Sequence, residues 1–398
     1  ILDEVFMLPK ANYLEWNIAA ETWQISCYLQ PETATPILNL EEAKQQIRQK
    51  LHAAVNRHLI ADAPIGVFLS GGIDSGIIAL EASTIKGSNL HTLSLTFDES
   101  DYDESKFQQI LADKMGSKHH HLNIKAADFN EQSATILQAM DQPSADGINT
   151  WFVSRLAQKH GLKAVLSGLG GDELFGGYPS FKRIGLLRKL DQILPENVLK
   201  LFQSSPVEAY QKLAYLSLRS GLGYYLALRG YFAPQQIASI LNIPVKEVWT
   251  KISRFEYPTN SENNNNIFAA NLEQDLYMKN QLLRDTDAMS MQFGIEIRIP
   301  FLDKNFLTCV NSIKSNIRFD QKLSKGLLIK SYQHILPEEI WKRKKMGFSF
   351  PLQKWLKNNP IVAELQKSSN PSIASFTQGF LQDKVHWSKI MALYFIKN

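Results

Sequence analysis

The sequence predicts an α/β protein with a doubly wound parallel sheet in its first part and mainly helical structure in its C-terminal part. Two observations lead to this prediction. Between residues 65 and 167, short apolar runs alternate with helical patterns of about 10–15 residues, as in parallel sheets covered by helices. From about residue 186 onward, helical patterns dominate. We therefore expect an α/β lobe over residues 31–185 and a helical lobe over residues 186–398.

The first regular element is a predicted helix over residues 41–59. Apolar residues recur at every fourth position, which places them on one face of a helix. Asn39, with Glu42 three residues later, resembles a capping box at the start of this helix. The apolar positions are Ala43, Ile47, Leu51, Val55 and Leu59.

Alternating strands and helices follow. The predicted strands are 65–69, 90–97, 120–124 and 163–167. The predicted helices are 75–82, 104–115, 129–140 and 149–160. Open sheets of this kind bind ligands where the carboxyl ends of the strands lead into the next helices, so functional residues are expected in those loops.

The composition is that of a globular protein. The chain has 44% hydrophobic and 21% charged residues, and its net charge of +4 does not indicate nucleic-acid binding. No run reaches the roughly 18–20 apolar residues of a membrane span, and the N-terminus does not resemble a signal peptide. Cys27 and Cys309 lie outside any C-x-x-C pattern, so we expect no zinc site, no disulfide framework and a cytoplasmic location.

A loop of small residues joins the first predicted strand to the next helix. Gly71 and Gly72 allow the backbone to approach a phosphate, Ser70 and Ser75 offer hydroxyls, and the helix N-terminus offers free amides. Asp74 would repel a bare phosphate, so its presence favours Mg²⁺ between the carboxylate and a pyrophosphate. The lysine of the kinase-type phosphate loop is absent. The alternative is a purely structural glycine turn.

The pattern S-G-G-x-D-S resembles the loop of the N-type ATP pyrophosphatases. That resemblance implies a fold similar to the adenine nucleotide alpha hydrolases, cleavage of ATP between its α and β phosphates, and an adenylated intermediate. Several enzymes share the loop: GMP synthetase, NAD synthetase, argininosuccinate synthetase, tRNA thiolases and asparagine synthetase. Other motifs must therefore decide among them.

A second glycine-rich run follows the last predicted strand. It contains five glycines in ten residues and places a second carboxylate, Asp172, at the carboxyl end of a strand. Residues 167–178 resemble the S-G-x-G-x-D-E-x-F-G-G-Y signature of asparagine synthetases, and Ser167 and Gly168 would then border the nucleotide. By itself, the run is also compatible with a structural turn.

Two later segments continue the resemblance. Residues 287–303 are similar to the family segment D-x-x-S-M…E-x-R-x-P-F-L-D. Its residues Glu296, Arg298 and Asp303 either belong to the site that binds the carboxylate substrate (the acceptor) or form a structural ion-pair network. Lys325 best matches a family lysine that would stabilise charge on the α-phosphate. In the basic run 343–351, Lys344 and Lys345 are weaker candidates, because such runs are usually exposed.

The matches run in family order from residue 65 to about residue 356. The resemblance implies ATP and Mg²⁺ as cofactors, Asp74 and Asp172 as metal ligands that act with Lys325, and Phe68 and Leu95 as adenine-pocket walls or core. It also implies that aspartate reacts with glutamine-derived ammonia, releasing AMP and pyrophosphate, and it is compatible with a homodimer.

Two departures weaken the assignment of the acceptor. Leu169 stands where asparagine synthetases carry a glutamate, and Gln142 stands where an acid is common. Both changes remove negative charge from the expected acceptor site. The alternatives are another carboxylate, a lactam-forming reaction like that of the β-lactam synthetases, or a nucleotide-binding subunit without catalytic activity.

The N-terminal segment 1–30 resembles the tail of a glutaminase domain. The chain begins with Ile1 and lacks the N-terminal cysteine nucleophile of that domain, and Cys27 has the wrong context. We expect the glutaminase domain either to have been truncated or to be supplied by a partner that provides ammonia.

Overall fold

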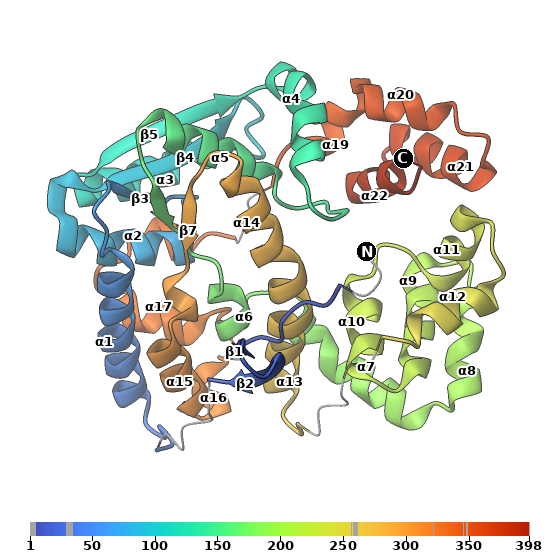
Figure 1. The fold of residues 1–398 in the computed structure, drawn as a ribbon, viewed down its shortest axis with the longest axis horizontal. Coiled ribbons are helices and arrows are strands. Elements are labelled where there is room, and N and C mark those ends of the chain that lie inside the picture. The colour runs from blue at the N-terminus through green and yellow to red at the C-terminus, as the bar shows by residue number, and fades with distance from the viewer. Residues whose placement is uncertain are drawn as a thin grey trace.

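The computed structural model contains a five-stranded parallel sheet, which lies to one side of the molecule, at the upper left in Figure 1. The structure describes residues 5–28, 35–255, 257, 262–320, 322–344, 346–347 and 349–397. The strand order is β5-β4-β3-β6-β7. The chain therefore adds β4 and β5 on one side of β3 and then adds β6 and β7 on the other side. The strands are β3 (Ile65–Phe68), β4 (His91–Phe97), β5 (Lys118–Ile124), β6 (Ala164–Leu166) and β7 (Glu296–Arg298).

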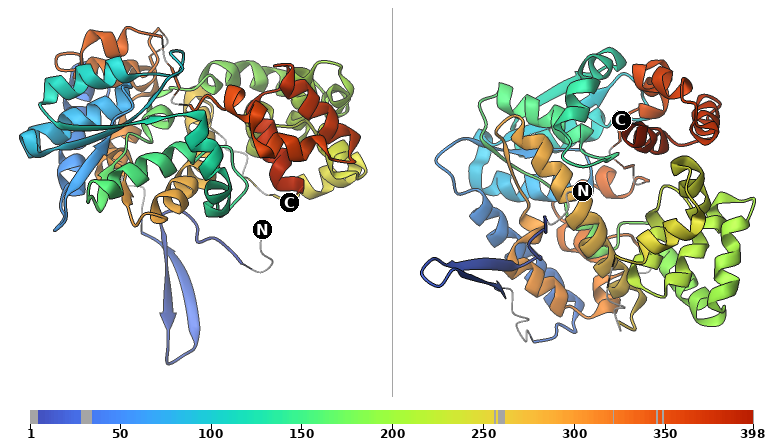
Figure 2. Two further views of the ribbon diagram at one scale, coloured as in Figure 1. Left: turned by 90° about the horizontal axis from the view of Figure 1, so that it is seen from above. Right: turned by 45° about the vertical axis from the view of Figure 1, so that its right-hand side comes forward.

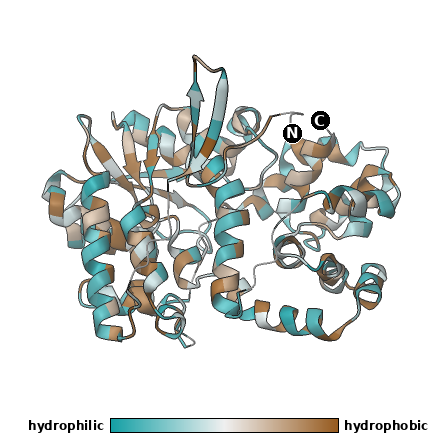
Figure 3. Cartoon of the chain, turned by 60° about the horizontal axis from the view of Figure 1, so that its bottom comes forward, coloured by the Kyte–Doolittle hydropathy of each residue, from teal (hydrophilic) through white to brown (hydrophobic). Residues whose placement is uncertain are grey.

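Helices cover both faces of this sheet, which confirms the predicted doubly wound α/β fold. Along β3, Val67 belongs to one apolar core and Phe68 packs against another, because successive residues of a strand point to opposite faces. Figure 3 shows hydrophilic and hydrophobic residues alternating along the covering helices. These helices are α1 (Leu40–His58), α2 (Ile73–Lys86), α3 (Ser105–Met115), α4 (Ala126–Ala139), α5 (Ile148–Lys159) and α6 (Gly171–Phe175).

The predicted first helix agrees with α1 to within one residue at each end. Its start is capped by Asn39, whose side-chain oxygen accepts hydrogen bonds from the backbone N–H groups of Glu41 and Glu42 at 2.8 and 3.2 Å. Its buried stripe packs against α15 and α17. The later helices therefore belong to the layer on one face of the sheet (Figure 1).

The helical elements after residue 180 serve two purposes. One group forms a smaller apolar core of its own around Leu216, Tyr224 and Phe268. The helices that contribute to this core are α7 (Ser180–Ile193), α8 (Glu196–Leu201), α10 (Gly221–Arg229) and α13 (Asn265–Leu272). Three further helices, α9 (Glu208–Gln211), α11 (Pro234–Leu241) and α12 (Val245–Ile252), lie between them in the chain. A ten-residue π-helical stretch, Glu273–Leu282, then leads into α14 (Leu283–Met291).

The chain then returns to the sheet through β7, a strand that the sequence did not predict. Residues expected in a helical lobe, 186–398, thus also supply a strand and the helices next to α1. The returning helices are α15 (Lys304–Ser312), α16 (Ser315–Arg318), α17 (Gly326–Tyr332) and α18 (Glu338–Trp341). The last helices pack into the apolar core on the opposite face of the sheet. They are α19 (Leu352–Trp355), α20 (Pro360–Gln366), α21 (Pro371–Leu381) and α22 (Trp387–Lys397).

An antiparallel hairpin of β1 (Asn12–Asn17) and β2 (Thr22–Cys27) projects away from the rest of the chain (Figure 2). Trp16 and Trp23 face each other across it and are both exposed. A two-stranded hairpin alone is marginally stable in water, so exposed aromatic residues here mark a surface that lacks a packing partner in the described structure. None of the described helices combines the length and apolar character needed to cross a membrane.

The segment around β7 makes the structural ion-pair network that the sequence left as one of two alternatives. Arg298 Nη1 donates hydrogen bonds to the backbone carbonyls of His58 and Ile60 at 2.8 and 2.7 Å, at the end of α1. Asp303 accepts two hydrogen bonds from Arg57, at 2.7 and 3.0 Å, and its Oδ1 caps α15. These contacts tie the chain that returns through β7 to the first helix.

Asp303→Ala should destabilise the fold by about 1–2 kcal/mol, because it removes both the helix cap and the partner of Arg57. Burial alone would raise the pKa of Asp303, but hydrogen bonds from Arg57 and two backbone amides lower it overall. The stabilisation should therefore be full above the unfolded pKa of about 4 and be lost as the pH falls through the lower folded value. Urea unfolding at several pH values measures this effect.

Asp303→Asn is the matched control, because its side-chain oxygen can still cap the helix while the charge is gone. It should lose less stability than Asp303→Ala and lose the acid dependence. Equal stability of both variants and the parent chain would contradict this role.

Candidate active site

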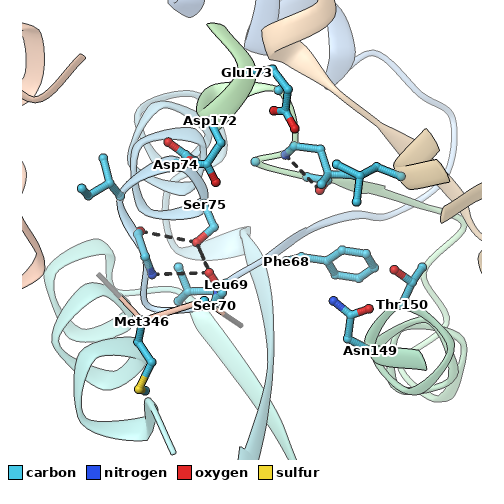
Figure 4. A pocket seen from close by; sticks show the side chains of 18 of the residues that line it. Phe68, Leu69, Ser70, Asp74, Ser75, Asn149, Thr150, Asp172, Glu173 and Met346 are labelled. Atoms are coloured by element: carbon cyan, nitrogen blue, oxygen red, sulfur yellow. Dashed lines mark hydrogen bonds between the residues drawn. The ribbon is translucent and has the colours of Figure 1, made fainter. Parts of the chain in front are cut away.

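A cavity of about 510 Å³ opens at the carboxyl ends of β3, β4 and β6. Figure 4 shows Asp74, Asp172 and Ser75 gathered together, with Phe68 and Asn149 to one side of them. Except for Gly71, the residues predicted to bind ATP or the metal ion line this cavity, and so does Lys325. They are Phe68, Ser70, Gly72, Asp74, Ser75, Leu95, Ser167, Gly168, Asp172 and Lys325. Parallel strands that end at one edge of a sheet bring these distant residues together.

The loop between β3 and α2 is held by its own serines. The Ser70 and Ser75 Oγ atoms lie 2.9 Å apart, and the backbone N–H of Ser70 donates to Ser75 Oγ at 3.2 Å. Gly71 has a φ of +77°, which favours glycine, and its carbonyl accepts a hydrogen bond from Arg343 at 3.1 Å. Gly71 therefore shapes the loop, and the N-terminus of α2 stays open toward the cavity, as an anion-binding site requires.

A lysine lies between the two predicted metal-binding carboxylates. Lys325 is only 4% exposed and forms ion pairs with Asp74 and, at 2.5 Å, with Asp172. Burial alone would lower the pKa of Lys325, but the charges of Asp74 and Asp172 outweigh it and raise the pKa above its ordinary value. The two carboxylates therefore favour the protonated form of the lysine, and three segments far apart in the sequence meet at this contact.

The two glycine-containing loops approach each other closely. A Cβ atom at Gly168 would lie 2.6 Å from the backbone nitrogen of Ser75. No side chain fits in that space, so glycine is required here for a backbone contact and not for an unusual φ. The second glycine-rich run therefore packs directly against the start of α2.

The carboxylates of this cavity fit a metal ion that takes most of its ligands from a bound phosphate and from water. Among the described residues, no group of three or more His, Cys, Asp and Glu side chains is arranged to hold a metal. Asp74 and Asp172 supply two carboxylates, and Mg²⁺ commonly binds one or two carboxylates together with phosphate oxygens and water. Because Lys325 already pairs with both, it would have to share them with the metal ion.

The cavity also contains residues that sequence reasoning missed. Glu173 is buried beside Asp172, and the Tyr178 hydroxyl donates a hydrogen bond to it at 2.7 Å. Burial, followed by the charge of Asp172, raises the pKa of Glu173 to about 7. Its place directly after Asp172 in the glycine-rich motif was the available signal.

Another part of the cavity lining is polar and comes from the segment before α5, from the π-helical stretch and from α14. Asp146, Asp285 and Tyr277 line it. Gln142 does not line the cavity but donates a hydrogen bond to Asp285 at 3.0 Å. No sequence signal marked Tyr277, because its position depends on the π-helical geometry.

The basic run near residue 344 contributes through a different residue than expected. Lys344 is exposed and does not line the cavity, and Lys345 lies outside the described residues. Arg343 does line it, pairs with Glu104 and lies 4.1 Å from the ring centroid of Phe107. Arg343 thus braces the loop at Gly71.

This fold and cavity define an α/β protein with a small-residue loop at the N-terminus of α2 and an adjoining pair of carboxylates. The chain belongs to the asparagine synthase family, because the model of that family matches residues 46–386. This confirms the resemblance found in the sequence, and the family comprises ligases that form carbon–nitrogen bonds.

Named relatives agree with this assignment. Asparagine synthetase (glutamine-hydrolyzing) 1 of Bacillus subtilis is 29% identical over 79% of this chain and 50% of its own length. A putative glutamine-hydrolyzing asparagine synthetase of Mycobacterium tuberculosis is 29% identical over 90% of this chain and 56% of its own. The chain thus spans about half the length of these relatives. A solved NMN synthetase from Francisella tularensis matches 61% of this chain and 96% of its own at 15% identity and a TM-score of 0.26, too weak to support any argument.

Gly168→Ala should weaken ATP binding about tenfold or more and destabilise the fold by about 1–3 kcal/mol, because the added methyl pushes the two loops apart. Fluorescent-nucleotide titration and thermal unfolding measure the two effects. Gly347→Ala is the control, since Gly347 also lines the cavity but has open space around it. Normal nucleotide affinity of Gly168→Ala would contradict the close packing of the loops.

Proposed function

We propose that this chain catalyses ATP-dependent amide synthesis through an acyl-adenylate. A carboxylate attacks the α-phosphorus of ATP, pyrophosphate leaves, and ammonia then attacks the acyl carbon and displaces AMP. The observation that carries the proposal is the placement of Lys325 between Asp74 and Asp172 beside the loop of Ser70–Ser75. A protein that only binds a nucleotide needs no such arrangement.

Each part of the cavity has a role in this reaction. The serine hydroxyls of the loop and the N-terminus of α2 bind the β and γ phosphates. Asp74 and Asp172 hold Mg²⁺, which would neutralise charge on the departing pyrophosphate. Lys325 stabilises the negative charge that develops at the α-phosphate. The enclosed cavity holds the acyl-adenylate against the nucleophile and limits its hydrolysis.

The expected acceptor is aspartate, and the expected source of ammonia is glutamine. The printed names of the relatives support both, since they are called glutamine-hydrolyzing asparagine synthetases. Glutamine use would require a glutaminase domain or partner, and we propose that the hairpin β1–β2 belongs with it. Its exposed Trp16 and Trp23 would then be covered. The reaction would take place in the cytoplasm.

A different carboxylate acceptor is the second candidate, and Leu169 favours it. Leu169 lines the cavity where the family pattern has a glutamate, and leucine can neither accept a proton nor pair with ammonium. In this case the adenylation machinery is unchanged and only the acceptor, or an amine within it, differs.

Pyrophosphate release by the purified chain with ATP, Mg²⁺, ammonium and aspartate tests the proposal. Stimulation by aspartate together with asparagine formation supports the first candidate. Pyrophosphate release that depends on another carboxylate supports the second. No pyrophosphate release with any carboxylate, in a folded chain that binds ATP, would favour a nucleotide-binding subunit. Pyrophosphate release that is lost in Asp74→Ala would exclude it.

Lys325→Met should lower the rate of pyrophosphate release about 10²–10³-fold while ATP still binds, because the cation at the α-phosphate is gone. Lys322→Met is the matched control, since Lys322 lies three residues earlier and is exposed. A Lys325→Met variant that is as active as Lys322→Met would contradict the role of Lys325.

A further inference from the structure

We propose that the acceptor carries a cationic nitrogen that binds at Asp146, and that it has no second carboxylate at that end. The inference rests on the proposed acyl-adenylate reaction and favours the second candidate, a carboxylate acceptor other than aspartate. It would make an amino-monocarboxylate a better acceptor than aspartate.

Positive and negative side chains are unevenly distributed around the cavity. The cations among its described lining residues are Lys325 and Arg343. Both lie at the phosphate-loop end and both already pair with acids, Lys325 with Asp74 and Asp172, and Arg343 with Glu104. The lining also carries Asp146 and Asp285.

Asp146 is positioned by neutral donors. The Tyr277 hydroxyl and Gln281 Nε2 donate hydrogen bonds to its Oδ2, at 3.1 and 2.6 Å. Both donors come from the π-helical stretch Glu273–Leu282, and such stretches are rare and frequent at functional sites. The hydrogen bonds fix the orientation of the carboxylate without neutralising its charge.

The charge of Arg229 acts on Asp146, but the Arg229 side chain is already paired with another acid. Arg229 lies close enough to lower the pKa of Asp146 by its charge. However, Arg229 Nε donates to Glu273 at 2.7 Å, and its guanidinium lies 4.5 and 3.7 Å from the ring centroids of Tyr178 and Tyr277. It does not line the cavity, so it cannot hold a carboxylate of the substrate there.

Burial disfavours the charged forms of Asp146 and Asp285 when no ligand is bound. Burial is the largest influence on Asp146 and raises its pKa. It also raises the pKa of Asp285 to about 6, with Asp146 adding repulsion. Asp285 accepts hydrogen bonds from the neutral Ser144 and Gln142. A cationic nitrogen would relieve both costs, whereas a second carboxylate would add another negative charge.

Three acyl-adenylate mimics test this with minimal differences. Propionyl-, β-alanyl- and β-aspartyl-sulfamoyladenosine share one acyl chain; the second adds an amine to the first, and the third adds a carboxylate to the second. Calorimetric titration of the full chain should show that the β-alanyl compound binds at least about tenfold more tightly than the propionyl compound. The β-aspartyl compound should bind more weakly than the β-alanyl compound.

Asp146→Asn should bring the affinities of the β-alanyl and propionyl compounds close together. The propionyl compound should bind this variant as it binds the parent chain, which also shows that the cavity is intact. Asp141→Asn is the matched control, because Asp141 is exposed, pairs with Arg284 and does not line the cavity. It should keep the preference of the parent chain.

The outcomes separate this inference from the proposed function. Equal affinity of the parent chain for the propionyl and β-alanyl compounds, or tightest binding of the β-aspartyl compound, would overturn the inference while adenylation stands. If none of the three binds more tightly than sulfamoyladenosine itself, the acyl-adenylate reaction is wrong and the inference falls with it. Comparison within the parent chain requires no variant, so poor folding of Asp146→Asn cannot hide the result.

Discussion

The contact of Lys325 with Asp74 and Asp172 is the interaction on which the cavity depends. Buried charges are stable only when their partners lie close, so this ammonium holds the start of α2, the start of α6 and the start of α17 together. Two carboxylates and one lysine leave one net negative charge. That remaining charge suits a site that takes up a further cation along with an anionic nucleotide.

The close packing around this contact explains the glycine-rich segments. The second run can touch the first loop because Gly168 leaves no side chain between them. Arg343 then braces the first loop from the other side through the carbonyl of Gly71. The two cations near this loop, Lys325 and Arg343, are each paired with acids. Asp146 and Asp285, by contrast, accept hydrogen bonds from neutral side chains. One cavity therefore has two chemically distinct groups of charged side chains.

The helical part of the chain is not an appendage to the sheet. Residues after 295 supply β7, the ion pair of Arg57 with Asp303, and the lysine at the centre of the site. Sequence patterns did not reveal β7, because two of its three residues are charged, whereas the equally short β6 is entirely apolar. For Glu296, Arg298 and Asp303, sequence patterns left two roles open, and only the position of Arg298 against the end of α1 favoured the structural one.

The sequence by itself determined the alternation of strands and helices, the small-residue loop after β3 and the family, because local periodicity and ordered motifs carry that information. It also predicted Asp74 and Asp172 as metal ligands and Lys325 as a lysine at the α-phosphate, but not that the lysine pairs with both carboxylates. Only the tertiary structure decided that Glu173, Arg343, Asp146 and Tyr277 share the same cavity. Their positions depend on burial, on a π-helical stretch and on contacts between distant segments, none of which leaves a periodic signal in the chain.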